Sequence, residues 1–302
     1  MCRLLGYLGA PVLLEELIVL PDNALIRQAT DAQMLAMLNL AGYGLAAWDA
    51  GMAQPDLPFT FHSTQVAVLD TNLRAVAKKL RVGALVAHLR GVAHDGSAVV
   101  NQQSCHPFAM AGSPLVLAHN GDLHDFAQMR FALTEHLKPA VARRMTSLID
   151  SAFLHALVLS QFDDPAGPFT CDQIHRAVEG ALAIVRKVRG EHGIDRSSSV
   201  NLMVSDGRSL VATRFTYDFG KFDKPAMQGA VEFLSQWYTY GDDYRFADGE
   251  WKMVGAGGQS TLVASEPLTR DVSTWIEVPE YSALLVDRES GQTRRRIRPI
   301  EV

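Results

Sequence analysis

The sequence of 302 residues is poor in cysteine, with only Cys2, Cys105 and Cys171. A small, odd number of cysteines argues against a disulfide framework and favours a reducing compartment. The chain also lacks the apolar run of about 20 residues that a membrane-spanning helix requires. Its first residues lack the long apolar core of a signal peptide. We therefore expect a cytoplasmic protein that does not enter a membrane.

The sequence also lacks an excess of positive charge. Its 28 lysines and arginines are outnumbered by 33 aspartates and glutamates, which gives a net charge of -5 and no electrostatic basis for binding nucleic acid. What is present is an ordinary globular composition, with 48% hydrophobic and 20% charged residues. Because no linker or repeat interrupts the chain, we expect one domain over residues 1–302.

The hydrophobic pattern predicts two clear helices between two groups of strands, which indicates an α+β fold with sheets packed against helices. The helices are expected at Ile149–Phe162 and Cys171–Arg189. The strands are expected at Arg3–Leu8, Gly42–Asp49, Gly83–Arg90, Pro114–Leu123, Ser199–Ser205, Ser209–Phe215, Thr261–Ser265, Trp275–Val278 and Ala283–Val286. Residues Ala24–Leu40 have helical propensity, and Arg294–Arg298 is interpreted as a solvated basic tail.

The second residue of the chain is a cysteine, and this position is chemically significant. Removal of Met1 would leave Cys2 with both a thiol and a free α-amino group. The reference pKa of such an amine is about 7.7–8.0 and that of the thiol about 8.5, so the amine can accept the thiol proton near neutrality. Position alone favours the simpler interpretation, an inert, buried cysteine at the start of a strand.

Three polar stretches lie where predicted strands end or a predicted helix begins. Arg90 ends a buried strand, and an arginine can grip a carboxylate through two hydrogen bonds. Asn120 and Gly121 end another strand, and a side-chain amide with a backbone N–H can stabilise an oxyanion. Asp150 begins a helix, where its carboxylate could hold an ammonium group. Together with Cys2 as a nucleophile, these groups are the ones that acyl transfer from a γ-glutamyl compound requires.

Each stretch also has an ordinary structural interpretation. Arg90 fits an exposed or salt-bridged arginine, Asn120 and Gly121 fit the centre of a hairpin turn, and Asp150 fits a helix N-cap. A metal site is disfavoured because the spacing of its candidate ligands matches no zinc pattern; these are His94, Cys105, His106 and His119.

The order of the motifs resembles the class II glutamine amidotransferases, which are N-terminal-nucleophile (Ntn) hydrolases. The resemblance rests on Met1-Cys2-Arg3, then Arg90 followed by His94, then His119-Asn120-Gly121, then Asp150 before a helix. The start Met1–Tyr7 resembles the stand-alone branch that includes the ergothioneine-pathway γ-glutamyl amidohydrolase and the glutathione-degradation amidase. Later segments, Asn201–Gly207 and Val263–Leu268, extend the resemblance over nearly the whole chain.

The resemblance implies a four-layer αββα sandwich and hydrolysis of the γ-glutamyl amide bond of glutamine or a related compound. By position, Cys2 is the nucleophile that forms a thioester, and Asn120 and Gly121 form the oxyanion hole. Substrate contacts are then expected from Arg90, His94 and Asp150. No cofactor and no metal are expected.

The chain departs from the family pattern at several positions, and the sequence therefore does not identify the leaving amine of the substrate. Gly91 and Ala93 replace a tryptophan and a threonine, Asp95 is inserted, and Ala152 stands where an acid is frequent. Two other functions remain as alternatives: a non-catalytic γ-glutamyl-binding or regulatory subunit, and a glutaminase subunit that delivers ammonia to a separate synthase. A synthase or peptidase partner and a homo-oligomer are both compatible with the sequence.

Overall fold

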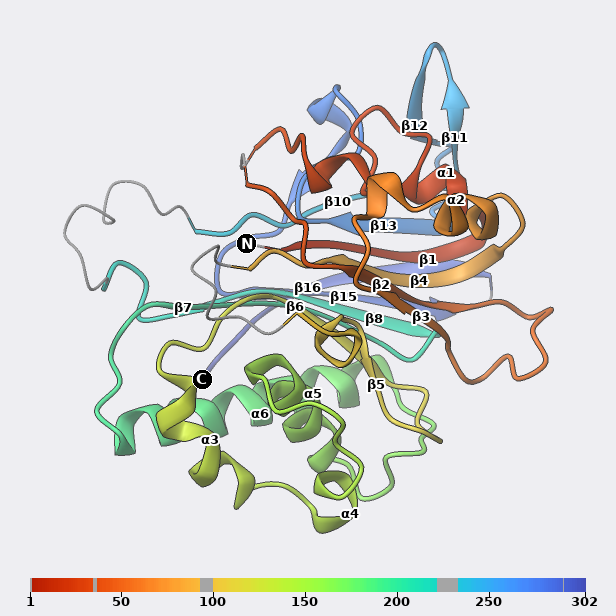
Figure 1. Cartoon of the computed structure of the whole chain (residues 1–302). Helices are drawn as coiled ribbons and strands as arrows, with labels where there is room; N and C mark the ends of the chain where they lie inside the picture. Colours follow the sequence, from red (N-terminus) through yellow and green to blue (C-terminus); the bar gives the residue numbers. More distant parts are fainter. Residues whose placement is uncertain (1, 35–36, 93–99, 222–232, 290) are drawn as a thin grey trace.

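The computed structural model describes residues 2–34, 37–92, 100–221, 233–289 and 291–302. Figure 1 shows four layers, with two sheets packed face to face and helices on both outer sides. The lower helical layer contains α3 (Phe126–Thr134), α4 (Pro139–Ala142), α5 (Asp150–Ser160) and α6 (Cys171–Glu191). The upper layer contains the short helices α1 (Leu14–Ile18) and α2 (Thr71–Ala77). The predicted αββα sandwich is therefore confirmed.

The sheet next to α1 and α2, here called sheet A, is built from antiparallel pairs of strands. Its strand β1 (Arg3–Leu13) pairs with β4 (Arg81–Leu89) on one side and with β13 (Ser260–Ala264) on the other. In spatial order the strands are β14 (Ile276–Glu277), β10 (Trp237–Gly241), β13 (Ser260–Ala264), β1 (Arg3–Leu13), β4 (Arg81–Leu89), β2 (Tyr43–Trp48) and β3 (Phe59–Ser63).

The sheet next to the larger helices, here called sheet B, is also antiparallel. In spatial order its strands are β16 (Gln292–Pro299), β15 (Ser282–Glu289), β8 (Ser209–Arg214), β7 (Ser198–Ser205), β6 (Val116–Gly121) and β5 (Phe108–Ala109), with β9 (Thr216–Tyr217) paired to β7. A separate hairpin, β11 (Asp243–Ala247) with β12 (Glu250–Val254), projects beyond sheet A in Figure 1.

The alternation of side chains along each strand divides the core into three parts. Between the sheets lie residues such as Leu4 and Leu8 of β1, Val86 of β4, and Val116 and Ala118 of β6. Their neighbours in sequence point outward, where one cluster fills the space between sheet B and the helices and another lies under α1 and α2. Parity thus assigns a face to residues of β6 and to those of β1 up to Leu8, after which the register of β1 with β4 shifts.

The helices covering sheet B follow from their sequences. Nearly all of α5 is buried, because it lies among the other helices and sheet B. Helix α6 is amphipathic and begins with a capping box, in which the Thr170 hydroxyl and the Gln173 side chain bond each other's backbone N–H. Within the described residues, every helix is too short or too polar to cross a membrane.

Three predictions about secondary structure need correction. Among the described residues of 24–40, the chain forms only the 3-10 turn Arg27–Ala29. Buried side-chain amides hold this segment in an irregular path, because Asn39 donates to the Gln28 carbonyl and Gln28 donates to the Asn23 carbonyl. The strand expected at 275–278 is reduced to β14. The basic stretch at 294–298 is not a tail, because it lies in edge strand β16, where Arg296 pairs with Asp172 at 3.0 Å.

Candidate active site

Cys2 immediately precedes β1, and its parity places its side chain on the same side as Leu4 and Leu8, between the two sheets. The residue is only 7% exposed. Its Sγ lies 3.4 Å from the backbone nitrogen of Gly91, which donates a hydrogen bond to the sulfur, and 3.6 Å from the Gly91 carbonyl oxygen. The backbone just after β4 therefore binds the Cys2 thiol, which lies at the start of the neighbouring strand β1.

Burial raises the pKa of the Cys2 thiol above its ordinary value. The Gly91 N–H and the positive charge of Arg90 act in the opposite direction, while the negative charge of Asp150 adds to the rise. The thiol is therefore protonated at neutral pH, and its use as a nucleophile requires a base. The same interactions place Arg90 and Asp150 within electrostatic reach of the sulfur.

The start of β1 is fixed by contacts that involve its backbone. The buried Arg3 side chain donates from Nη1 to the Cys2 carbonyl oxygen at 3.1 Å. Burial lowers the pKa of Arg3, and the nearby charge of buried Glu266 opposes this. Ser265 accepts a hydrogen bond from the Leu4 N–H through its hydroxyl and donates its own N–H to the Leu4 carbonyl. Sequence reasoning missed Arg3 and Glu266, although an arginine within an apolar strand is an unusual pattern.

Arg90 follows the last residue of β4 and is 7% exposed. Its backbone is bound on both sides, because its N–H donates to the Gly42 carbonyl at 2.8 Å and its carbonyl accepts from the Ala41 N–H at 3.0 Å. The interpretation of Arg90 as an exposed arginine is therefore wrong. His94, the other substrate contact predicted nearby, lies outside the described residues.

Asn120 and Gly121 are the last two residues of β6 and pair with Asn201 and Val200 of β7, so they do not form the centre of a hairpin turn. Asn120 shares the parity of Val116 and Ala118, and its side chain therefore faces the space between the sheets, as that of Cys2 does. Strand β6 packs against both β1 and β4. Within the described part of the chain, the buried Asn120 Oδ1 has no hydrogen-bond partner.

Gly121 is required by the local backbone. Its φ of +146° lies in a region that other residues rarely adopt, and a Cβ atom would stand 1.8 Å from the carbonyl oxygen of Ser199. Strand β7 thus approaches the end of β6 more closely than any side chain would permit. This close approach explains why position 121 of the His119-Asn120-Gly121 motif is a glycine.

Asp150 is the first residue of α5, and Ile149 occupies the N-cap position, so the N-cap interpretation is wrong. The Asp150 carboxylate accepts from the Leu123 N–H at 3.0 Å through Oδ2 and from the Ser151 N–H at 2.8 Å through Oδ1. The helix N-terminus favours a negative charge at this position. These contacts hold the carboxylate beside the segment that follows Gly121.

Three buried histidines lie near these groups. The rings of His88 and His106 are 4.1 Å apart, and burial lowers the pKa of both well below the usual value. His106 Nδ1 accepts from the His119 N–H at 3.3 Å, and the His119 ring contacts Ser151 and Ser199. Over the described residues, no group of three or more His, Cys, Asp or Glu has the geometry to hold a metal ion.

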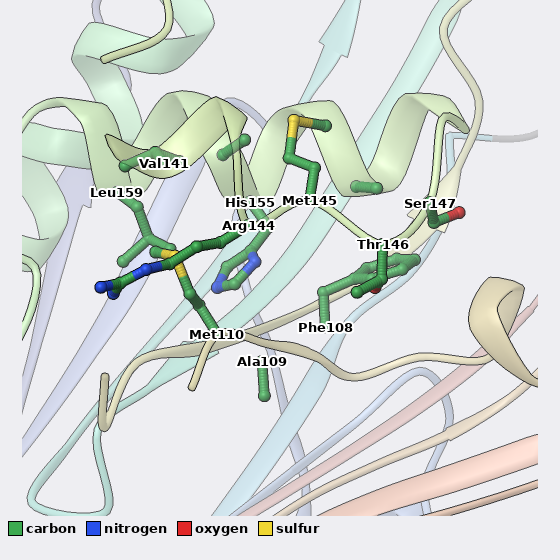
Figure 2. Close-up of a pocket in the computed structure, with 12 residues that line it drawn as sticks. Phe108, Ala109, Met110, Val141, Arg144, Met145, Thr146, Ser147, His155 and Leu159 are labelled. Carbon is green, nitrogen blue, oxygen red and sulfur yellow. The ribbon is translucent and has the colours of Figure 1, made fainter. Parts of the chain in front are cut away.

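A small cavity lies beside α5, along the stretch from Ala152 to Leu159 (Figure 2). Phe108, Ser147 and His155 are among its lining residues, and its volume of about 20 Å³ accommodates about one water molecule. A larger cavity of about 380 Å³ lies around Glu266 and Asn23. The charge of Glu266 in this cavity acts on Arg3, whose side chain occupies the opposite face of β1 from Cys2.

Comparison with known proteins shows the family to which the chain is similar. The model of the family described as "Glutamine amidotransferases class-II" matches residues 31–298. The chain is 26% identical to the probable glutamine amidotransferase DUG3 of Saccharomyces cerevisiae, an alignment that covers 96% of this chain and 83% of that protein.

Solved structures share the fold. A glutamine aminotransferase class-II domain protein from Silicibacter pomeroyi superposes with a TM-score of 0.62 at 22% identity, over the full length of both chains. Glutamine phosphoribosylpyrophosphate amidotransferase from B. subtilis superposes with a TM-score of 0.58 at 14% identity, over all of this chain and 50% of that one. Since the family model covers most of its length, the chain belongs to the class II glutamine amidotransferases.

Proposed function

We propose that this protein is an amidohydrolase that cleaves the γ-glutamyl amide bond of glutamine or a γ-glutamyl compound. In this proposal the reaction passes through a thioester on Cys2, which becomes the N-terminal residue when Met1 is removed. The observation that carries the proposal is that the Cys2 sulfur accepts a hydrogen bond from the Gly91 N–H, directly after Arg90 of sheet A, and is influenced by the opposite charges of Arg90 and of Asp150 from α5.

This pair of charges suits the head group of an α-amino acid. A guanidinium binds a carboxylate through paired hydrogen bonds, so Arg90 is the proposed partner of the substrate α-carboxylate. The Asp150 carboxylate is the proposed partner of the α-ammonium group. With the head group held in this way, the γ-carbonyl carbon of a glutamyl chain is directed toward Cys2.

The proposed chemistry begins with the buried thiol, which needs a base because burial raises its pKa. The freed α-amino group of Cys2 takes the thiol proton, and the sulfur attacks the γ-carbonyl carbon. The Asn120 side-chain amide and the Gly121 N–H stabilise the oxyanion that forms. The carbon–nitrogen bond then breaks, and the leaving amine takes the proton. Water hydrolyses the thioester, which releases the γ-carboxylate and restores the thiol.

The test combines the mass of the intact protein with turnover. The purified protein should lack the mass of Met1 and should release ammonia from L-glutamine or an amine from γ-glutamyl amides. Cys2→Ala should abolish turnover and leave the melting temperature nearly unchanged. Cys171→Ala is the matched control, since this cysteine is also buried but lies in α6 against the Val286 carbonyl.

Two results would contradict the proposal. Full hydrolysis by Cys2→Ala would exclude the thioester on this residue. Full hydrolysis by a protein that retains Met1 would exclude the α-amino group of Cys2 as the base. A protein that binds glutamine but never releases ammonia would instead favour the non-catalytic alternative.

A further inference from the structure

The imidazole of His119 bonds two groups on different elements, and neither contact follows from the family motif. His119 alternates with Asn120 along β6, so its side chain points away from Asn120 and toward α5. Its Nε2 lies 3.1 Å from the Ser199 carbonyl oxygen, and its Nδ1 lies 2.9 Å from the Ser151 hydroxyl. Both His119 and Ser151 are buried, at 0% and 4% exposed.

The Ser199 carbonyl is the point at which the end of β6 is held. It accepts from the Asp122 N–H at 3.1 Å as well as from His119, and it stands where a Cβ of Gly121 would be. His119, Gly121 and Asp122 therefore all meet one oxygen of β7. The position of the Gly121 backbone depends on that oxygen.

The Ser199 contact also fixes the protons in this network. A carbonyl oxygen only accepts, so Nε2 must carry the hydrogen, and in the neutral imidazole Nδ1 is then an acceptor. The Ser151 hydroxyl consequently donates to His119. Asp150 Oδ1 is a second acceptor within reach of the same hydroxyl, at 3.2 Å against 2.9 Å for His119 Nδ1, and the single hydroxyl hydrogen serves one of them at a time.

The direction of this one proton affects Asp150. An ionised carboxylate has about four lone-pair sites. Within the described residues, the backbone N–H groups of Leu123 and Ser151 occupy two of these sites. A third site would be taken if Ser151 turned its proton to Oδ1. While His119 accepts that proton, the carboxylate keeps its remaining sites for an incoming ammonium group.

We propose that His119 is a positioning residue with two separable tasks: Nε2 holds the oxyanion segment through Ser199, and Nδ1 keeps the Ser151 hydroxyl from occupying Asp150. The inference rests on the proposed function. It explains how the enzyme would select substrates that carry an α-amino group. That selectivity is measured as the ratio of kcat/KM for L-glutamine to kcat/KM for glutaramate, which is glutamine without the α-amino group.

Two substitutions of His119 separate the tasks. His119→Gln keeps a donor near the Nε2 position but removes the acceptor for Ser151, whose hydroxyl then turns to Asp150. We expect the selectivity ratio to fall on the order of tenfold, the effect of one competing hydrogen bond. His119→Asn keeps an acceptor near Nδ1 but loses the Ser199 contact. We expect kcat to fall for both substrates while the ratio stays near the wild-type value.

The decisive experiment is a rescue. Adding Ser151→Ala to His119→Gln removes the competing hydroxyl and should restore the selectivity ratio, although a second buried side chain has been truncated. Adding Ser160→Ala instead should restore nothing. Ser160 is the matched control because it is another buried hydroxyl of α5, which accepts from the Lys138 N–H at 3.0 Å.

The outcomes are distinguishable. If both His119 variants lose kcat/KM equally for both substrates, and Ser151→Ala restores nothing, His119 has only a structural role. That result would overturn this inference but not the proposed function. Wild-type protein without turnover of either substrate would contradict the proposed function, and the inference with it. Should the His119 variants fail to fold, Ser151→Ala alone decides, because the inference requires it to keep the wild-type ratio.

Discussion

The two sheets contribute to the candidate site in different ways. Sheet A contributes Cys2 and Arg90, which are brought together by the pairing of β1 with β4, where Arg3 lies opposite Leu89. Sheet B contributes Asn120 and Gly121 from the end of β6, while Asp150 comes from the helix layer behind it. The first half of the site is made of side chains placed by strand register. The second depends on close contacts between backbones.

This difference predicts a difference in tolerance to substitution. A side chain that projects from a strand end can be truncated while the pairing of the backbone stays intact. Substitutions of Cys2 and Arg90, the half of the site on sheet A, should therefore affect substrate binding or chemistry and leave the fold unchanged. The half on sheet B includes a position where even one extra carbon has no space. Changes there should affect both the chemistry and the fold.

The largest effect is expected for Gly121→Ala. Its Cβ would stand 1.8 Å from the Ser199 carbonyl oxygen, so β6 and β7 must separate and the proposed oxyanion donors must move. We expect kcat for glutamine to fall at least about a hundredfold, the usual effect of losing one such donor. A clear decrease in melting temperature should accompany this loss.

Gly112→Ala is the matched control for this substitution. Gly112 also has a positive φ, +79°, but a Cβ there would meet nothing within 4 Å. It should lower stability modestly through backbone strain and leave kcat unchanged. Near-wild-type turnover by Gly121→Ala would remove the proposed contrast between the two halves.

The next largest effect is expected for Arg90→Ala, in the half on sheet A. The loss of charged hydrogen bonds to a carboxylate is worth about 1.5–3 kcal/mol, or roughly 10- to 150-fold in kcat/KM for L-glutamine. The matched substrate is 4-aminobutanamide, which is glutamine without its α-carboxylate, and its turnover should change little. A similar loss for both substrates would show that Arg90 does not bind the carboxylate.

The sequence was most informative where local chemistry determines structure. The apolar runs of β1, β4 and β6 and the apolar residues of α5 and α6 are sufficient to predict these elements and an α+β fold of sheets packed against helices. The four-layer arrangement is predicted by the resemblance to the family. The motif around Gly121 could be recognised because a glycine is the one residue that the backbone accepts there. Candidate residues at strand ends and at a helix start were therefore found from local patterns.

The missed contacts join residues that are distant in sequence. Ser199 and His119 are 80 positions apart, and Glu266 acts on Arg3 from the other end of the chain. A periodic pattern assigns a residue to a face but does not identify the partner it meets there. For the same reason, the sequence alone indicates a basic tail around Arg296, whereas in the structure this residue pairs with Asp172 of α6.

A smaller effect, which depends on pH, is expected in the helix layer behind sheet B. Burial lowers the pKa of His155 to about 4, against about 6.5 in an unfolded chain. Between these values the unfolded state binds more protons, so stability falls as the pH falls from 6.5 to 4. The contribution of His155 to this loss is roughly 3 kcal/mol in all.

His155→Gln tests this contribution, because glutamine can still donate to the Leu115 carbonyl, which His155 contacts at 3.1 Å, but does not titrate. Unfolding by urea at pH 7 and pH 5 should show a smaller loss of stability in the variant than in the wild-type protein. Some dependence should remain, since the pKa values of His88 and His106 are lowered too. Identical losses in both proteins would show that His155 is not protonated on unfolding.

The smallest effect is expected on the outer side of sheet A, for Tyr43→Phe. The Tyr43 hydroxyl donates to Asp70 Oδ2 at 2.7 Å, while Asp70 Oδ1 caps α2 by accepting from the Asn72 and Leu73 N–H groups. The cap remains after the substitution, so only the hydrogen bond to the carboxylate is lost, at a cost of about 1–2 kcal/mol. Turnover should not change, because α2 supports the sheet without contributing to the site. A loss of activity larger than the loss of stability would mean that the outer layer helps to position Arg90, and the contrast between the two halves would then extend beyond the two sheets.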